Sequence, residues 1–195
     1  MSSEKKSSLI NEIFTIPNIL VYIRIALIPI FAGLYMNADS QSDYYMALGV
    51  MAAAFLTDFF DGKIARAFNC VTELGKTIDP IADKLYQFSV ALCLMMKYPL
   101  IISVAVILFI KEISMGIMGL VLINKGGKIF GARWYGKVCT AFVDISLVLL
   151  LVFPVFEINI SRSVTDALIY MCDIILIVVS VMYTRLFAEK IKALD

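Results

Sequence analysis

Six long apolar stretches follow one another along the chain, separated by short polar segments. They cover residues 17–36, 44–60, 78–96, 99–123, 134–153 and 164–187. Each is close to the ~20 residues that a helix needs to cross the hydrocarbon core of a bilayer. Because lipid offers no hydrogen-bond partners, the backbone of each stretch must bond internally as a helix. The pattern therefore predicts an all-α fold, an integral membrane bundle of six helices.

A shorter amphipathic stretch, residues 8–16, precedes the first of these segments. Its apolar residues at 9, 10, 13 and 14 are interrupted by Asn11 and Glu12. This pattern is typical of a short interfacial helix that lies on the membrane. An extension of the first spanning helix fits the pattern equally well.

Composition agrees with a protein that resides in lipid. Of the 195 residues, 61% are hydrophobic and 17% are charged, against about 45–50% and about 25% in soluble domains. This length predicts a single domain, residues 1–195. The 17 basic and 16 acidic residues nearly cancel, which argues against nucleic-acid binding. The absence of histidine excludes Ser-His-Asp catalysis and histidine-bound zinc.

Lysine and arginine are distributed unequally between the two sets of connections, which predicts the orientation in the membrane. The basic residues on one side are Lys5, Lys6, Lys63, Arg66, Lys76, Lys125, Lys128, Arg133, Arg185, Lys190 and Lys192. The opposite connections hold only Lys97 and Arg162. We therefore expect both termini and the 61–77 connection to be cytoplasmic.

Four aspartates lie where the second and third stretches meet this cytoplasmic side. Asp58 and Asp61 are spaced i, i+3, and Asp79 and Asp83 are spaced i, i+4, so each pair shares a helix face. Ionisable groups at such positions are costly and usually functional. Oxygen ligands without histidine or cysteine select Mg²⁺, Mn²⁺ or Ca²⁺. Two such ions shared by four carboxylates would suit phosphoryl transfer.

The residues between the two pairs favour a phosphorylated substrate. Gly62 and Gly75 allow a large group to approach the backbone, and the guanidinium of Arg66 can bind a phosphate. The bland alternative is that the aspartates only form salt bridges with Arg66, Lys76 and Lys84 at a membrane edge. Such salt bridges could explain any single aspartate, but they explain the set of four aspartates poorly. The run Asp58-x2-Asp61-Gly62-x2-Ala65-Arg66-x8-Gly75-x3-Asp79-x3-Asp83 fixes eight residues.

This run, residues 58–83, resembles the signature of the CDP-alcohol phosphatidyltransferases, and the likeness extends over nearly the whole six-helix chain. It implies that Asp58, Asp61 and Asp79 bind two Mg²⁺ or Mn²⁺ ions. Asp83 would act as the general base and as a further metal contact. The residues implied to line the CDP group are Gly62, Ala65, Arg66 and Gly75. The implied reaction transfers a phosphatidyl group from CDP-diacylglycerol to an alcohol and releases CMP, in the inner membrane of a bacterial cell.

The acceptor alcohol is less sharply indicated. The segments Ile16-Pro17-Asn18-Ile19-Leu20 with Arg24, Asp79-Pro80-Ile81-Ala82-Asp83-Lys84, and Gly136-Lys137 with Thr140 are similar to the subgroup that uses glycerol 3-phosphate. Departures at Val21, Lys111, Cys139 and Val143 leave open the subgroup that uses phosphatidylglycerol.

Several cations are candidates for binding an acceptor phosphate. Lys111, within the fourth stretch, contacts either that phosphate or a carboxylate of another helix, such as Asp144 or Asp173. Glu112 should be the less natural partner, because adjacent helical residues point about 100° apart. Further candidates are Arg133, Lys137 and Arg185, which could equally be ordinary flanking charges. Asn18 and Arg24 reach either the pyrophosphate or a neighbouring helix.

Two features bear on assembly and on other functions. Small residues at 49–54 and the pair Gly116 and Gly119 favour close helix packing, and the resemblance implies a homodimer. A divalent-cation transporter is a competing function, because intramembrane carboxylates also line ion paths. A transporter would more naturally place them near the midplane between internal repeats, whereas these aspartates cluster at one face.

Overall fold

A computed structural model describes residues 15–67, 72–128, 130–131 and 133–194, and among them every regular element is a helix. Six helices follow in chain order: α2 (Ile16–Met36), α3 (Gln41–Ala67), α4 (Glu73–Met95), α5 (Ile101–Asn124), α6 (Trp134–Val155) and α7 (Arg162–Lys192). The expected all-α, six-helix architecture is thereby confirmed. The predicted interfacial helix at residues 8–16 lies almost entirely outside the described residues.

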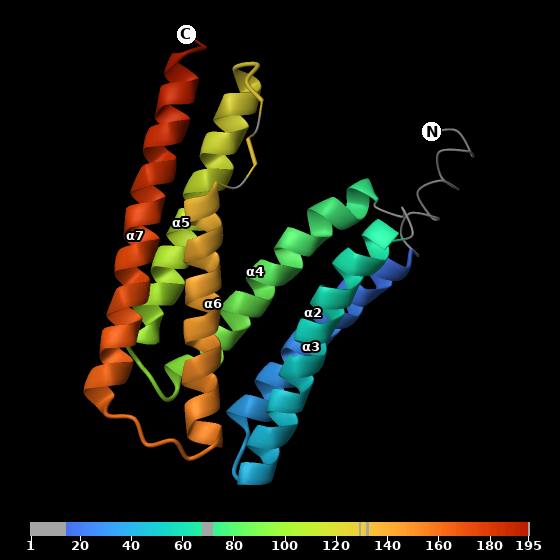
Figure 1. Cartoon of the computed structure of the whole chain (residues 1–195), viewed down its shortest axis with the longest axis vertical. Helices are drawn as coiled ribbons and strands as arrows, with labels where there is room; N and C mark the ends of the chain where they lie inside the picture. The colour runs from blue at the N-terminus through green and yellow to red at the C-terminus, as the bar shows by residue number, and fades with distance from the viewer. Residues whose placement is uncertain (1–14, 68–71, 129, 132, 195) are drawn as a thin grey trace. The chain divides into compact units, whose positions relative to one another are not determined.

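The chain divides into two compact units, residues 1–93 and 94–195. In the first unit, α2 and α3 run side by side and are joined by a short turn (Figure 1). Ser40 and Asp43 cap the start of α3 through two reciprocal hydrogen bonds. The backbone N–H of Ser40 donates to Asp43 Oδ2 at 2.9 Å, and the backbone N–H of Asp43 donates to Ser40 Oγ at 3.3 Å. This capping box satisfies two donors that the helix itself leaves open.

In the second unit, α5 and α6 each pack against α7 (Figure 1). The buried face of α7 repeats with helical spacing at Ile169, Cys172, Leu176, Val179 and Tyr183. Many of the remaining large side chains of these helices point outward, for example Phe109, Ile117 and Ile174, which are more than half exposed. Apolar side chains on the outer surface of a bundle are expected where the solvent is lipid rather than water.

Length and composition identify α2, α5, α6 and α7 as candidate membrane spans among the described residues. The other two helices, α3 and α4, carry the acidic signature residues and are less apolar. Both also extend beyond the predicted apolar stretches, α3 to Ala67 and α4 back to Glu73. The expected 61–77 connection is therefore wrong in its bounds, because hydropathy marks where a helix leaves lipid rather than where it ends.

Candidate active site

A buried arginine of α2 joins three of the signature aspartates. The Arg24 side chain is 2% exposed, and its Nη1 donates to Asp79 Oδ1 at 3.0 Å and to Asp83 Oδ1 at 2.6 Å. Its Nη2 lies 2.7 Å from Asp58 Oδ1. We expected Arg24 to reach either the pyrophosphate or a neighbouring helix, and the structure shows contacts with neighbouring helices. One guanidinium thus holds α2, α3 and α4 at a single point.

The three carboxylates face outward from this point. Their side chains are 44%, 43% and 52% exposed at Asp58, Asp79 and Asp83. One oxygen of each lies within 4.8 Å of the others. Such a spacing suits a shared cation, and an all-oxygen donor set fits Mg²⁺ or Mn²⁺. Arg24 alone leaves the described cluster with two surplus negative charges, so these residues fit a divalent ion.

A polar contact at the start of α4 fixes where its aspartates lie. Thr72 caps the helix, because its Oγ1 accepts the backbone N–H of Gly75 at 2.9 Å. Asn18 of α2, which is buried, donates from Nδ2 to the same Oγ1 at 3.0 Å. A Cβ at position 75 would lie 2.5 Å from Asn18 Oδ1 and 3.0 Å from Thr72 Oγ1. Gly75 therefore serves this close approach of α2 to α4.

Four other signature residues lie in α3, but the structure does not describe their side chains. They are Asp61, Gly62, Ala65 and Arg66. The roles expected for them as a metal ligand and as CDP-binding residues therefore stay predictions. The bland alternative, salt bridges to Arg66, Lys76 and Lys84, involves two side chains outside the described set. Asp58, Asp79 and Asp83 each form an ion pair with Arg24.

Lys111 of α5 is buried, as expected, but its carboxylate partner is not one that we favoured. Its Nζ lies 2.8 Å from Glu112 Oε1 on the same helix. The expectation that Glu112 is the less natural partner was wrong, because the four-carbon stem of lysine spans the angle between adjacent residues. Asp173 of α7 instead accepts a hydrogen bond from Ser103 Oγ of α5 at 2.6 Å, which is a polar contact between two helices.

The remaining cationic candidates lie at one end of α6 and α7. Arg133, Lys137 and Arg185 are exposed. The backbone N–H of Arg133 donates to Tyr183 Oη at 3.0 Å. A Cβ at Gly136 would overlap the ring and hydroxyl of Tyr183. Tyr183 thereby ties the start of α6 to α7.

Sequence reasoning missed two positioning residues, Thr72 and Tyr183. A threonine directly before a helix is a recognised capping signal and could have been found. The tyrosine carries no local signal. Only Gly136, in the noted Gly136-Lys137 pair, hinted at a close approach there.

Comparison with known proteins gives one family. Residues 14–187 match the family model "CDP-alcohol phosphatidyltransferase". A probable phosphatidylglycerophosphate synthase of Mycobacterium tuberculosis strain H37Rv is 33% identical over 145 residues, 73% of this chain and 68% of the relative. A CDP-diacylglycerol–glycerol-3-phosphate 3-phosphatidyltransferase of Aquifex aeolicus is 30% identical over 171 residues, 87% and 93% of the two chains. A CMP-forming cardiolipin synthase of Streptomyces coelicolor is 33% identical over 133 residues, 67% and 61% of the two chains.

Proposed function

Because this chain belongs to the CDP-alcohol phosphatidyltransferase family, an enzyme family, we propose that it transfers the phosphatidyl group of CDP-diacylglycerol to glycerol 3-phosphate. The products are phosphatidylglycerol phosphate and CMP. The observation that carries the proposal is the convergence of Asp58, Asp79 and Asp83, one oxygen of each within 4.8 Å, in a chain with the complete family signature.

A divalent-metal requirement is part of this proposal. Asp58, Asp79 and Asp83, with Asp61 from the same signature, would hold two Mg²⁺ or Mn²⁺ ions. Bound there, the ions would neutralise the pyrophosphate and stabilise the leaving CMP. Arg24, on the buried side, contacts one oxygen of each of the three described carboxylates and so holds them together. Their exposed sides stay available to a cation.

The chain's own residues also supply proton transfer. Asp83 would accept the proton of the acceptor hydroxyl as the oxygen of that hydroxyl attacks the lipid-bearing phosphorus. The phosphorus–oxygen bond to CMP breaks as the new ester bond forms. Gly62, Ala65, Arg66 and Gly75 would line the CDP group.

Glycerol 3-phosphate brings a phosphate that needs cationic partners. Lys111, Arg133, Lys137 and Arg185 are the candidates, all in the unit of residues 94–195. Lys111 would bind the acceptor phosphate while Glu112 balances its charge when the acceptor is absent. The relatives named for glycerol 3-phosphate or phosphatidylglycerophosphate favour this acceptor.

The test is release of CMP from CDP-diacylglycerol by the detergent-purified chain with Mg²⁺. Glycerol 3-phosphate, phosphatidylglycerol, inositol phosphate and serine are offered separately. Release that requires glycerol 3-phosphate supports the proposal. Release with phosphatidylglycerol alone supports the second candidate, a cardiolipin synthase, which the Streptomyces relative favours. The transporter hypothesis loses its support, because the family is one of enzymes.

The base is tested separately. The variant Asp83→Asn should lower CMP release about 100-fold or more, since general-base catalysis contributes about that much. The control Asp39→Asn removes an exposed carboxylate at the other end of α2 and α3 and should retain activity. Full activity of Asp83→Asn would contradict the assignment.

Two properties complete the proposal. The distribution of basic residues supports a cytoplasmic location for both termini and for the aspartates. The bacterial relatives support an inner-membrane location. One of the two sets of small residues, 49–54 or Gly116 with Gly119, would provide a homodimer face.

A further inference from the structure

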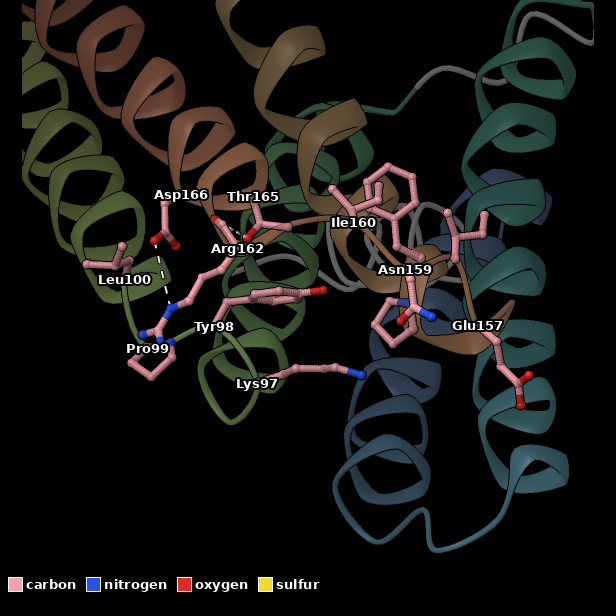
Figure 2. Close-up of a pocket in the computed structure, with 13 residues that line it drawn as sticks. Lys97, Tyr98, Pro99, Leu100, Glu157, Asn159, Ile160, Arg162, Thr165 and Asp166 are labelled. Carbon is pink, nitrogen blue, oxygen red and sulfur yellow. Dashed lines mark hydrogen bonds and ion pairs between the residues drawn. The ribbon is translucent and has the colours of Figure 1, made fainter.

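A cavity of about 780 Å³ in the unit of residues 94–195 lies where α5 and α7 begin and α6 ends. Figure 2 shows it between the 97–100 and 156–162 segments. Its position at the helix ends puts it at the boundary between lipid and water. The volume falls within the ~300–1,000 Å³ typical of small-molecule sites. No role in the proposed reaction uses it.

Both cations of this membrane face line the same cavity. Lys97 and Arg162 are the only basic residues in the connections opposite the Lys-rich side, and each belongs to the lining. Lys97 comes from the segment before α5, and Arg162 is the first residue of α7. Because they are 65 residues apart, only the fold brings them to one cavity.

The helix starts at this cavity add to its positive potential. Neither α5 nor α7 has an acidic residue in its first turn, and neither has a side-chain cap. A helix N-terminus carries roughly half a positive charge. Arg162 is therefore placed where a cation disfavours the helix, a cost that a bound anion would offset. These positive groups together favour a phosphate.

Two carboxylates line the cavity as well. Asp166 Oδ2 lies 3.9 Å from Arg162 Nε, and Glu157 stands on a different segment of the lining, after α6 (Figure 2). Glu157 has a backbone φ of 54°, a left-handed conformation that non-glycine residues rarely adopt. A ligand with both a phosphate and an ammonium would match this set of two cations and two anions.

The rest of the lining is suited to the glycerol backbone and first methylenes of a lipid. Phe153, Pro154, Ile158 and Ile160 supply apolar surface, and Tyr98 and Asn159 supply polar groups. Burial raises the pKa of Tyr98 above its ordinary value, so its hydroxyl stays protonated and able to donate. Phe156, beside this segment, is 54% exposed, as expected for a side chain that faces acyl chains.

We propose that this cavity binds the headgroup of an aminophospholipid, phosphatidylethanolamine, from the leaflet on the side of Lys97 and Arg162. In Figure 2 Arg162 lies with Asp166 on one side of the cavity, and Lys97 points toward the side where Glu157 lies. The phosphate therefore contacts Lys97, and the primary ammonium contacts Glu157. A quaternary ammonium donates no hydrogen bonds, so phosphatidylcholine should bind less well.

The test is native mass spectrometry of the full, delipidated chain in detergent with phosphatidylethanolamine, phosphatidylcholine or phosphatidylglycerol. We expect phosphatidylethanolamine adducts to dominate. The double variant Lys97→Ala with Arg162→Ala should lower their abundance roughly tenfold or more, because each charge-assisted hydrogen bond contributes about that factor. The matched control, Lys128→Ala with Lys192→Ala, removes the same charge from exposed residues at the other end of the unit and should leave binding unchanged.

Two further arms separate the outcomes. Glu157→Gln should remove the preference over phosphatidylcholine, and it serves as the test variant if the double variant fails to fold. Free phosphoethanolamine at equal concentration should not displace the lipid. Unchanged binding in the double variant, an equal loss in the control, or a persistent preference for phosphatidylglycerol would overturn the proposal. Full displacement by phosphoethanolamine would also overturn it, by identifying a soluble ligand.

Discussion

Arg24 is the residue on which the geometry of the candidate active site depends. Its guanidinium is buried, whereas Asp58, Asp79 and Asp83 are about half exposed. Without Arg24, three carboxylates within 4.8 Å would repel one another in a medium of low dielectric. The arginine therefore preserves the cluster when no divalent ion is bound.

The variant Arg24→Gln should lower the stability of the metal-free protein by about 1–3 kcal/mol, a figure reduced for the exposure of the carboxylates. Excess Mg²⁺ should recover much of this loss, because the ion takes over the neutralisation. Thermal unfolding in detergent with EDTA and with Mg²⁺ measures both effects. Lys128→Gln, which removes an exposed cation, is the control. An equal loss of stability with and without Mg²⁺ would show that a bound cation does not replace Arg24 in neutralising the carboxylates.

Sequence reasoning identified the chemistry of the site but not all of its contacts. The spacing of the aspartates predicted a shared face, and Asp58, Asp79 and Asp83 do converge. The partner of Arg24 stayed open, because its carboxylates are 34 to 59 positions away along the chain. Glu112 was wrongly judged the less natural partner of Lys111, since helix geometry describes Cβ directions and not the reach of a long side chain.

Among the elements, α4 depends on how its first turn meets α2. Gly75→Ala should destabilise the protein by about 1–3 kcal/mol, because the added methyl meets Asn18 Oδ1 and Thr72 Oγ1. It should also lower CMP release, since Asp79 lies one turn further along α4. Gly33→Ala in α2 is the matched control: a Cβ there meets nothing within 4 Å, and alanine is the better helix former. Equal stability of the two variants would argue against a role for this contact.

The start of α3 should respond to acid. Hydrogen bonds from Ser40 hold the pKa of Asp43 below its ordinary value of 3.8. Because this pKa is lower in the folded than in the unfolded chain, ionised Asp43 stabilises α3 above pH 3.8. The contribution is lost as the pH falls through the folded value.

The variant Asp43→Asn should therefore melt slightly below the parent protein at pH 5–7, and the difference should shrink below pH 3.8. Thermal unfolding between pH 3 and pH 7 in one detergent checks this. Asp39→Asn, in the same turn, is the control. A difference that grew on acidification would contradict the assigned direction.

For the whole molecule, hydropathy predicted the spanning helices closely. The stretch 17–36 became α2 (Ile16–Met36), and 134–153 became α6 (Trp134–Val155). It failed at α3 and α4, which continue as helix through charged residues. A helix that emerges from lipid keeps its own hydrogen bonds, so the polar signature residues extend it instead of ending it.

The proposed orientation is tested by labelling single cysteines in a variant whose native cysteines are replaced by alanine. Arg162→Cys should react with a membrane-impermeant maleimide on intact cells. Lys192→Cys should react only after permeabilisation, because it lies at the opposite end of α7. Labelling of both on intact cells, or the reverse pattern, would contradict a cytoplasmic active site.

The location of Glu112 beside Lys111 also affects biosynthetic insertion. The two charges belong to the same helix, 2.8 Å apart, so α5 brings its own counter-charge when it leaves the translocon. Arg24 differs, because the carboxylates that contact it belong to α3 and α4, which are synthesised later. Helix α2 must therefore wait for α3 and α4 to neutralise Arg24, whereas α5 can enter the bilayer without such a delay.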